Sequence, residues 1–364
     1  MRTILLTPGP LTTSDATRAA MSRDWGSRDQ DFIDLSEGVR RRLGALVNAG
    51  DTHVVVPIQG AGTYAVEAAI GTLVPRDGRL LVLVNGAYGR RAAEMAERMG
   101  RSVATLECPE DQAVDPARVA AALRDDPAVT DVLLVHLETT SGLLNPLDAV
   151  AAVVAQAGRR LLLDAMSALG AVPIDLAATP VAAVMASANK GLEGVPGLAY
   201  VIAEAGHLDA MRGNSHSTSL DLQAQWAGFE ANRQWRFTPP THVVAALSAA
   251  LDQLDAEGGI AARAARYRGH MTALVVGMRQ LGFAPYLPDA LQGPVILTLR
   301  EPPGFDFAAL YQDLHRQGIV LYPGKLTREA SFRIGCIGAI TLADIERTLA
   351  AIGAWLQRHA QAAD

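Results

Sequence analysis

The sequence predicts an α/β protein with a mainly parallel central sheet, helices on both faces of that sheet, and a small C-terminal α+β domain. First, short apolar runs alternate with amphipathic segments from residue 53 to residue 190, which is typical of successive β–α units. Second, Gly258-Gly259 interrupts the chain, and a shorter alternation of strands and helices follows. Third, 364 residues, 49% of them hydrophobic, are enough for two domains.

These breaks divide the chain into three parts. We expect residues 1–14 to form an arm, because Pro8-Gly9-Pro10 excludes a helix and favours an extended backbone. Residues 15–257 are expected to form the large domain, and residues 258–364 the small C-terminal domain.

Strands are expected where apolar residues run without a helical period. In the large domain they are residues 53–58, 80–84, 102–106, 131–136, 161–163, 181–185 and 198–202. Helices are expected at residues 32–47, 64–73, 90–99, 115–124, 147–157 and 243–254. In the C-terminal part we expect strands at 294–299, 318–321 and 331–336, and helices at 260–281, 307–317 and 342–360.

Composition excludes several partners and compartments. The net charge of -6, without a basic run of five residues, argues against a nucleic acid or an anionic membrane as partner. No apolar segment reaches the roughly 18 to 20 residues of a membrane helix, and the first residues lack a signal-peptide pattern. Cys108 and Cys336 are far apart and have no metal-ligand spacing. We therefore expect reduced thiols, no bound metal and a cytoplasmic location.

One lysine stands in an unusual setting. Lys190 lies in a turn of small residues between the apolar runs 181–185 and 198–202. Burying an unpaired ammonium is unfavourable, whereas a lysine that holds pyridoxal 5'-phosphate (PLP) covalently becomes neutral. Asp164, at the end of the apolar run 160–163, supplies a carboxylate of the kind that keeps the PLP ring nitrogen protonated. Taken singly, Lys190 also fits a solvated turn, and Asp164 a helix cap.

A glycine-containing turn follows the first strand of the large domain. In a strand–turn–helix unit, the free N–H groups of the helix point towards a phosphate. Given Lys190, we expect Ala61, Gly62 and Thr63 to bind the PLP phosphate, with backbone N–H groups acting where Ala61 lacks a hydroxyl. Taken alone, a turn of this kind is common between a strand and a helix and does not indicate a binding site.

Motifs along nearly the whole chain resemble those of the class V, fold-type I PLP-dependent aminotransferases, and most closely those of the 2-aminoethylphosphonate–pyruvate transaminases. They lie at residues 6–14, 59–68, 85–89, 136–142, 164–167, 187–190, 235–242, 322–325 and 332–335. Each motif is weak alone, but their order and spacing together are specific.

The resemblance implies roles for residues near the cofactor. It implies that Tyr88 stacks on the PLP ring and that Thr139 donates to the PLP phenolic oxygen. Ser187 and Asn189 belong to the lysine motif and are expected beside the cofactor. As a single observation, Tyr88 would more often be a packing residue.

The resemblance also implies a homodimer with shared active sites. Trp235 and Thr238 match a turn that reaches across the dimer interface, where the threonine contacts the PLP phosphate of the partner. From the residues alone, Thr238 is a helix N-cap followed by prolines. Arg333, in a short apolar strand, is expected to bind the acidic head of each substrate, because guanidinium forks match carboxylate and phosphonate oxygens.

Two further segments bear on the substrate. By resemblance, the arm crosses the mouth of the active site, so Thr12 and Thr13 are candidates for the anionic head; a simple tether is the alternative. Phosphonate transaminases tend to carry Cys-Thr-Trp in the loop where this chain has Gly26-Ser27-Arg28. Relatives with other amino donors more often have a basic residue there, which makes Arg28 a candidate for substrate choice.

The resemblance implies a transaminase for small-molecule amine and 2-oxo acid substrates, which moves the amino group of 2-aminoethylphosphonate to pyruvate and yields phosphonoacetaldehyde and L-alanine. Lys190 would move the proton and Asp164 would keep the ring protonated. The main alternative is another donor and acceptor, such as alanine or serine with glyoxylate. A desulfurase or lyase is disfavoured, because Cys336 lies in the strand segment of Arg333. A non-catalytic regulator is disfavoured, because no DNA-binding segment is appended.

Overall fold

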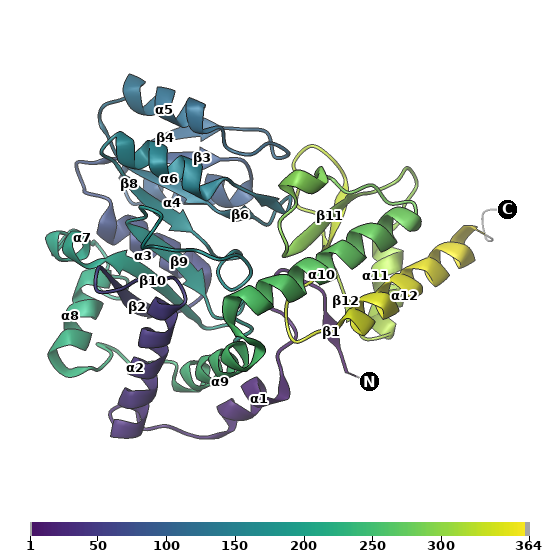
Figure 1. Ribbon diagram of the computed structural model, residues 1–364, viewed down its shortest axis with the longest axis horizontal. Coiled ribbons are helices and arrows are strands. Elements are labelled where there is room, and N and C mark those ends of the chain that lie inside the picture. The colour runs from purple at the N-terminus through teal and green to yellow at the C-terminus, as the bar shows by residue number, and fades with distance from the viewer. Residues whose placement is uncertain (1, 361–364) are drawn as a thin grey trace.

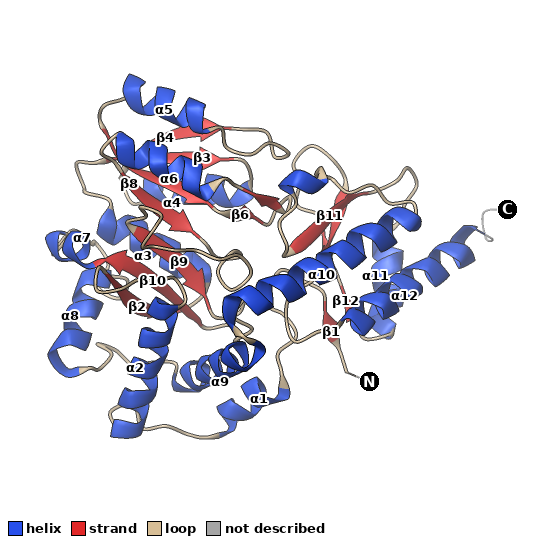
Figure 2. Ribbon diagram, viewed as in Figure 1, coloured by secondary structure: helices blue, strands red, loops and turns tan. Residues whose placement is uncertain are grey.

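The computed structural model of the protein describes residues 2–360. Residues 1 and 361–364, which belong to the expected arm and small domain, lie outside the described residues. Figures 1 and 2 show two lobes, with the long helix α10 (Gly259–Gln280) running between them.

The larger lobe is built on a seven-stranded sheet with the order β2-β10-β9-β8-β5-β3-β4. The strands are β2 (His53–Gln59), β3 (Arg79–Val84), β4 (Ser102–Glu107), β5 (Val129–Val135), β8 (Arg160–Asp164), β9 (Ala183–Ser187) and β10 (Leu198–Glu204). All of them run in one direction except β10, which is antiparallel to both its neighbours. The mainly parallel sheet is confirmed, and β10 is an exception that the sequence pattern did not indicate.

Helices cover both faces of this sheet. Alternate residues of β3 point to opposite faces, with Leu81 and Leu83 in one apolar cluster and Leu80 and Val82 in the other. The first face packs against α2 (Gln30–Ala45), α5 (Pro116–Asp125), α6 (Leu147–Gln156) and α9 (Thr241–Glu257). The second face packs against α3 (Gly62–Leu73), α4 (Ala87–Arg98), α7 (Ala205–Ala210) and α8 (Leu222–Asn232). No helix was expected from the sequence at the positions of α7 and α8.

The remaining short elements lie before and within this lobe. They are α1 (Asp15–Ala19), the 3₁₀ turn η1 (Ala20–Ser22), and the hairpin of β6 (Leu137–Glu138) and β7 (Leu143–Leu144).

The smaller lobe has its own apolar core. Its elements are α10, the 3₁₀ turn η2 (Asp289–Leu291), β11 (Ile296–Arg300), α11 (Phe307–Arg316), β12 (Ile319–Val320), β13 (Tyr322–Pro323), β14 (Ser331–Gly335) and α12 (Leu342–Ala360). An antiparallel sheet with the order β11-β14-β13 lies at its centre. Gly258 and Gly259, with φ of 105° and 77°, join α9 to α10 at the break expected from the sequence. The left-handed backbone there favours glycine.

The N-terminal segment joins the two lobes. Strand β1 (Ile4–Leu5) pairs in parallel with β12, and the side chains of Ile4 and Leu6 belong to the core of the smaller lobe. After this contact the chain passes Pro8 and Gly9 and enters α1 beneath the larger lobe, as Figure 1 shows.

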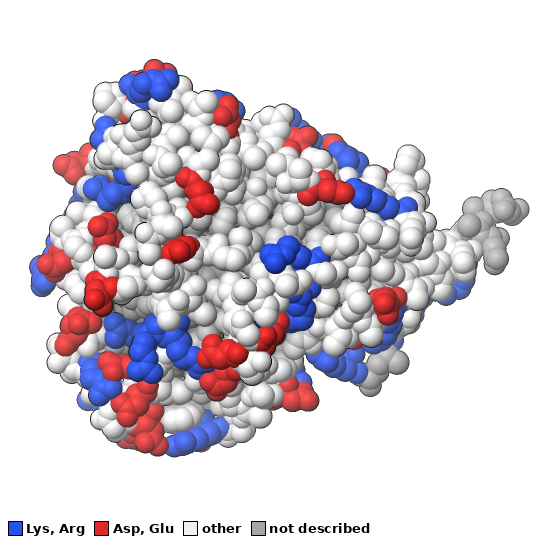
Figure 3. All heavy atoms as spheres, in the orientation of Figure 1, with Lys and Arg blue, Asp and Glu red and all other residues white. Residues whose placement is uncertain are grey.

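On the face drawn in Figure 3, acidic and basic side chains are interspersed rather than gathered in a single basic patch. Between residues 2 and 360, no helix is both long and apolar enough to span a bilayer.

Candidate active site

A cavity of about 310 Å³ lies at the carboxyl ends of β8 and β9, the edge of a parallel sheet where ligands bind. Nine residues predicted to hold the cofactor line this cavity: Ala61, Gly62, Thr63, Tyr88, Thr139, Asp164, Ser187, Asn189 and Lys190. The structure therefore brings together segments that are far apart in the sequence.

Lys190 follows β9 in a turn that aims its side chain at the N-terminal arm. Its Nζ donates to the backbone carbonyl oxygens of Pro8, at 2.7 Å, and Gly9, at 3.4 Å. Burial lowers the pKa of Lys190, and this effect outweighs the attraction of Tyr88 and Asp164. A lowered pKa increases the fraction of neutral amine, which is the form that can attack an aldehyde.

Asp164 is the last residue of β8 and is only 6% exposed. Its Oδ1 accepts a hydrogen bond from the N–H of Met166 at 3.0 Å. Burial raises the pKa of Asp164 to about 6, although that hydrogen bond favours the charged form. Such a carboxyl group gains from a cationic partner inside the cavity, and a protonated pyridine nitrogen is one.

The N-terminus of α3 forms another wall of the cavity. Ala61 is the N-cap residue, and no side chain caps the free N–H groups of this helix end. A Cβ on Gly62 would lie 2.4 Å from Sδ of Met166, so a larger residue at this position would displace the Met166 side chain that lines the cavity. On another wall, the buried Oγ of Ser187 has no hydrogen-bond partner within the described chain. A helix N-terminus with free donors and an unpaired buried hydroxyl fit a phosphate-bearing cofactor.

Tyr88 lies in the first turn of α4, where its N–H donates to Oε2 of the buried Glu138 at 3.2 Å. Burial alone would raise the pKa of the Tyr88 phenol, but a hydrogen bond with Thr139 and the positive charges of Lys325 and Lys190 lower it. Nζ of Lys325 lies 4.3 Å from the centroid of the Tyr88 ring. The phenol is therefore held among cations.

Arg333 projects from β14 and is 6% exposed. Its Nε donates to the carbonyl oxygen of Pro323 and its Nη1 to that of Thr139, both at 3.0 Å. Burial lowers the pKa of Arg333, and the neighbouring Tyr88 partly offsets this. These bonds fix the guanidinium between the two lobes and leave part of its five N–H donors for a ligand.

None of the four predicted substrate residues lines the cavity itself: Arg333 reaches its wall at Thr139, and Thr12, Thr13 and Arg28 have other surroundings. Oγ1 of Thr12 accepts from the N–H of Leu5 at 2.8 Å, so this side chain holds the arm. The carbonyl oxygen and Oγ1 of Thr13 accept from Arg18. Arg28 is exposed in the loop before α2. Within one chain, Thr12 and Thr13 therefore have structural roles, and Arg28 is exposed to solvent.

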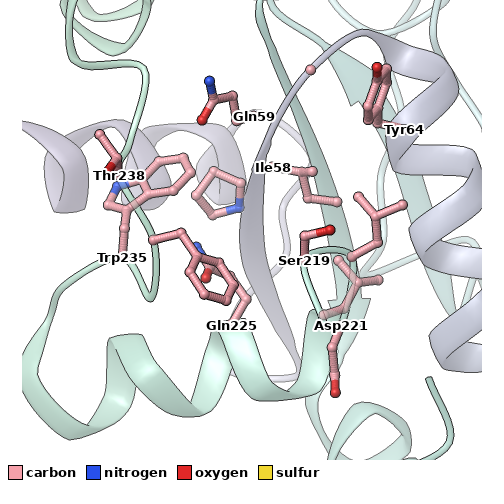
Figure 4. Close-up of a pocket in the computed structure, with 13 residues that line it drawn as sticks. Ile58, Gln59, Tyr64, Ser219, Asp221, Gln225, Trp235 and Thr238 are labelled. Atoms are coloured by element: carbon pink, nitrogen blue, oxygen red, sulfur yellow. The ribbon is translucent and has the colours of Figure 1, made fainter. Parts of the chain in front are cut away.

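Trp235 and Thr238 lie on a separate hollow of about 480 Å³, shown in Figure 4. Nε1 of Trp235 donates to Oγ of Ser36 at 2.9 Å, which anchors the turn against α2. Tyr64, 49% exposed, projects from the start of α3 into the same hollow. In one chain, therefore, the predicted dimer-spanning residues do not reach the Lys190 cavity.

Sequence reasoning missed two cationic residues of the site. Arg91 lines the cavity and lies 5.0 Å from the centroid of the Tyr88 ring. Its spacing of one helical turn from Tyr88 could have suggested this position. Lys325 ends a recognised motif at residues 322–325, yet no role was inferred for it.

The fold and the cavity define a family. Residues 13–339 match the model of the family described as Aminotransferase class-V, and the chain belongs to this family.

Individual proteins to which the chain is similar include the following transaminases. The chain is 54% identical to "2-aminoethylphosphonate--pyruvate transaminase 2" of Burkholderia lata over 96% of this chain and 93% of the relative. It is 51% identical to "2-aminoethylphosphonate--pyruvate transaminase" of Pseudomonas aeruginosa, with 96% and 95% covered. Pyridoxamine-pyruvate aminotransferase from Mesorhizobium loti superposes with a TM-score of 0.90 at 26% identity, with 98% of this chain and 93% of that chain covered. Alanine–glyoxylate aminotransferase from Nostoc sp. gives 0.90 at 25% identity, with 98% and 96% covered.

Proposed function

We propose that this protein is a PLP-dependent transaminase that transfers the amino group of 2-aminoethylphosphonate to pyruvate, giving phosphonoacetaldehyde and L-alanine. The observation that carries the proposal is the convergence of Lys190, Asp164 and the uncapped N-terminus of α3 on one cavity. The near full-length similarity to relatives of that name supports the choice of substrates.

Each group around the cavity has a part in this chemistry. When bound, PLP supplies an electron sink for the electron pair left as the donor's C–H bond breaks. The N–H groups at Ala61, Gly62 and Thr63 would hold its phosphate, and the carboxylate of Asp164 would hold the proton on its ring nitrogen. Lys190 would hold the cofactor and, once its amine is free, would move the proton at the donor's carbon.

The remaining residues would position cofactor and substrates. Tyr88 would stack on the ring, and Thr139 would donate to its phenolic oxygen. Ser187 offers an unpaired hydroxyl and Asn189 an amide at the wall. Arg333 would bind the phosphonate of the donor and then the carboxylate of the acceptor, which lets one site serve both half-reactions. Thr12 and Thr13 of the arm, and Arg28, complete the proposed substrate residues.

We also propose a homodimer with shared sites and a cytoplasmic location. Phe237, 52% exposed, lines the same hollow as Trp235 and Thr238. Large apolar side chains exposed beside a hollow are common at interfaces between subunits, and a second copy covering them would bring its own Thr238 towards the cofactor phosphate. The buried free thiols of Cys108 and Cys336 are consistent with a reducing compartment.

A second candidate uses the same groups with another substrate pair, such as alanine or serine with glyoxylate. The observation in its favour is the exposed Arg28, in the loop where phosphonate transaminases tend to differ from this chain.

A panel of donors tests the proposal. The purified holoenzyme is given 2-aminoethylphosphonate, L-alanine or L-serine with pyruvate or glyoxylate, and release of aldehyde or keto acid is measured. We expect kcat/KM for 2-aminoethylphosphonate with pyruvate to exceed every other pair by about tenfold or more. Preference for alanine or serine with glyoxylate would favour the second candidate. The Lys190→Ala protein should lose turnover and the visible absorbance band of the bound cofactor.

A further inference from the structure

Lysine is almost absent from this chain. Lysine and arginine together number 32, and only Lys190 and Lys325 are lysine. Arginine therefore provides the positive charge at every other basic position. The two side chains differ, because lysine carries a compact ammonium and arginine a broad planar fork. The proposed function explains Lys190, which must be an amine; Lys325 needs an explanation of its own.

The fold places the second lysine at the same site. Nζ of Lys325 lies over the ring of Tyr88, which lines the cavity, at 4.3 Å from the centroid. Its charge also reaches the amine of Lys190 and the buried carboxylate of Glu138. Within residues 2–360, no carboxylate forms an ion pair with Lys325. This ammonium therefore has charge available for an anionic ligand.

The segment that carries Lys325 is held firmly. Arg333 and Tyr322 are register partners in the β13–β14 ladder. A Cβ on Gly324 would lie 2.0 Å from the carbonyl oxygen of Ser331, so the chain between β13 and Lys325 is pressed against β14. Beyond it, the N–H and Oγ1 of Thr327 donate to Oε2 of Glu110, at 3.1 and 3.2 Å, across to the larger lobe. Lys325 thus lies in a loop held at both ends, two residues after the strand β13 that pairs with the strand of Arg333.

The two expected headgroups differ in charge. A carboxylate has one negative charge on two oxygens, whereas a phosphonate has three oxygens and carries up to two charges. Arg333 already gives two of its N–H groups to the carbonyl oxygens of Pro323 and Thr139. The remaining N–H groups of the Arg333 guanidinium match a single pair of oxygens. The third oxygen and the second charge require another cation. Lys325 is such a cation, and its charge, like that of Arg333, reaches the amine of Lys190.

We propose that Lys325 determines specificity for the phosphonate donor, with its ammonium completing the anion site that Arg333 begins. This inference rests on the proposed function and assigns the residue that recognises its donor. Pyruvate and alanine need Arg333 alone, so Lys325 favours phosphonate over carboxylate at the same site.

The test compares Lys325→Met and Lys325→Arg holoenzymes with wild type. The amino-donor half-reaction is followed by the cofactor's absorbance with 2-aminoethylphosphonate and with L-alanine. We expect the ratio of kcat/KM for 2-aminoethylphosphonate over that for L-alanine to fall about tenfold or more in Lys325→Met, as for loss of a hydrogen bond between charged groups. Lys325→Arg should recover part of this ratio. Lys325→Gln replaces Lys325→Met if the latter does not fold.

Calorimetry with two amine-free probes measures binding without turnover. The dissociation constant for ethylphosphonate should rise about tenfold in Lys325→Met, and that for propionate no more than about threefold. Arg328→Met is the matched control, because it removes an exposed positive charge from the same segment. It should keep the wild-type ratio.

The outcomes separate this inference from the proposed function. An equal loss with both donors in Lys325→Met would overturn the specificity role while leaving the proposed reaction in place. A wild type that does not use 2-aminoethylphosphonate, yet binds ethylphosphonate in a Lys325-dependent way, would overturn the donor and support the anion site. A wild type that neither uses nor binds phosphonates would overturn both.

Discussion

At the scale of single residues, the cavity holds an acid and a base whose pKa values are shifted in opposite directions by burial. Burial raises the pKa of Asp164 to about 6 and lowers the pKa of Lys190. Both shifts favour neutral side chains in the protein without its cofactor. The protonated ring nitrogen of a bound cofactor would lower the pKa of Asp164 again. Its aldehyde would react with the neutral amine that the lowered pKa of Lys190 favours.

The Asp164→Asn protein should show this in its stability without cofactor. An aspartate whose pKa rises from 3.8 to about 6 binds more protons when folded, so its contribution to stability falls as pH rises through that window. At pH 8 we expect the asparagine protein to be more stable than wild type by up to roughly 3 kcal/mol, and near pH 4 by little. Urea unfolding at both pH values measures the difference.

The control for this measurement is Asp77→Asn, which changes an exposed aspartate. Its effect should be the same at both pH values. Equal stability of Asp164→Asn and wild type at pH 8 would show that the buried carboxylate carries no penalty.

Gly9 is the second residue whose identity the site dictates. Its φ is 111°, and a Cβ would lie 2.6 Å from the carbonyl oxygen of Asn189 and 2.7 Å from Cδ of Lys190. Gly9→Ala should displace the arm, at a strain of about 1–3 kcal/mol. We expect faster proteolysis of the first residues and weaker retention of PLP. Gly206→Ala, where a Cβ meets nothing within 4 Å, should leave both unaffected. An arm that resists proteolysis in Gly9→Ala would contradict this reading.

At the scale of elements, α10 holds the turn that follows Lys190. Nη1 of Arg263, 1% exposed, donates to the carbonyl oxygen of Gly191 at 3.0 Å, and its Nε pairs with Glu257 at 2.5 Å. The hydroxyl of Tyr267 donates to Oε1 of the buried Glu193 at 2.6 Å. The helix that leads into the smaller lobe therefore fixes the backbone beside the reactive amine.

Removing Arg263 should be strongly destabilising. Arg263→Met leaves the buried Glu193 and the half-buried Glu257 with less compensation, and breaking a buried pair in this way destabilises by about 3–5 kcal/mol. Chemical unfolding measures the loss. Arg268→Met, which removes an exposed arginine from the same helix, should fall within about 0.5 kcal/mol of wild type. Similar values for the two proteins would mean that the buried network contributes no more than a surface charge.

Helices and strands with a clear pattern of apolar residues could be predicted from the sequence. Features that depend on how one element packs against another could not. The parallel strands and the helices from α2 to α6 read directly from apolar spacing. The antiparallel direction of β10 depends on the length of the turn after Lys190, which leaves no distinctive residue pattern. In the site, the end of a predicted strand located Asp164, whereas Ser187 was expected from the resemblance of the lysine motif. Lys325 was missed because it lies after β13 in the smaller lobe and meets Tyr88, in α4 of the larger lobe, only where the two lobes pack together.

At the scale of the whole molecule, the two hollows described above belong to one proposed site only if two chains combine. Lys190 faces one cavity, and Thr238 lies on the other. The turn at residues 60–64 borders both hollows, but no residue of the described chain lines both. The shared-site proposal therefore makes a prediction that does not depend on the identity of the substrate.

Mixing two inactive or impaired chains tests this. Lys190→Ala and Thr238→Ala homodimers are purified, mixed under conditions that exchange subunits, and assayed with PLP. If Thr238 acts on the partner's site, each mixed dimer has one site with both residues intact, so activity should rise above the sum of the separate proteins. Exchange of wild-type subunits is the control for assembly. Activity equal to the sum would indicate that each chain works alone.

The pairing of β1 with β12 has a consequence for how the protein is made. Ile4 and Leu5 are translated roughly 300 residues before their partners Ile319 and Val320. Until then the arm has no strand to dock on, and the carbonyl oxygens of Pro8 and Gly9 are not held near Lys190. A contact between such distant residues forms late. The nascent large lobe can therefore fold while the cavity at Lys190 is still not covered by the arm. A segment that is translated early would then be the last to cover this cavity.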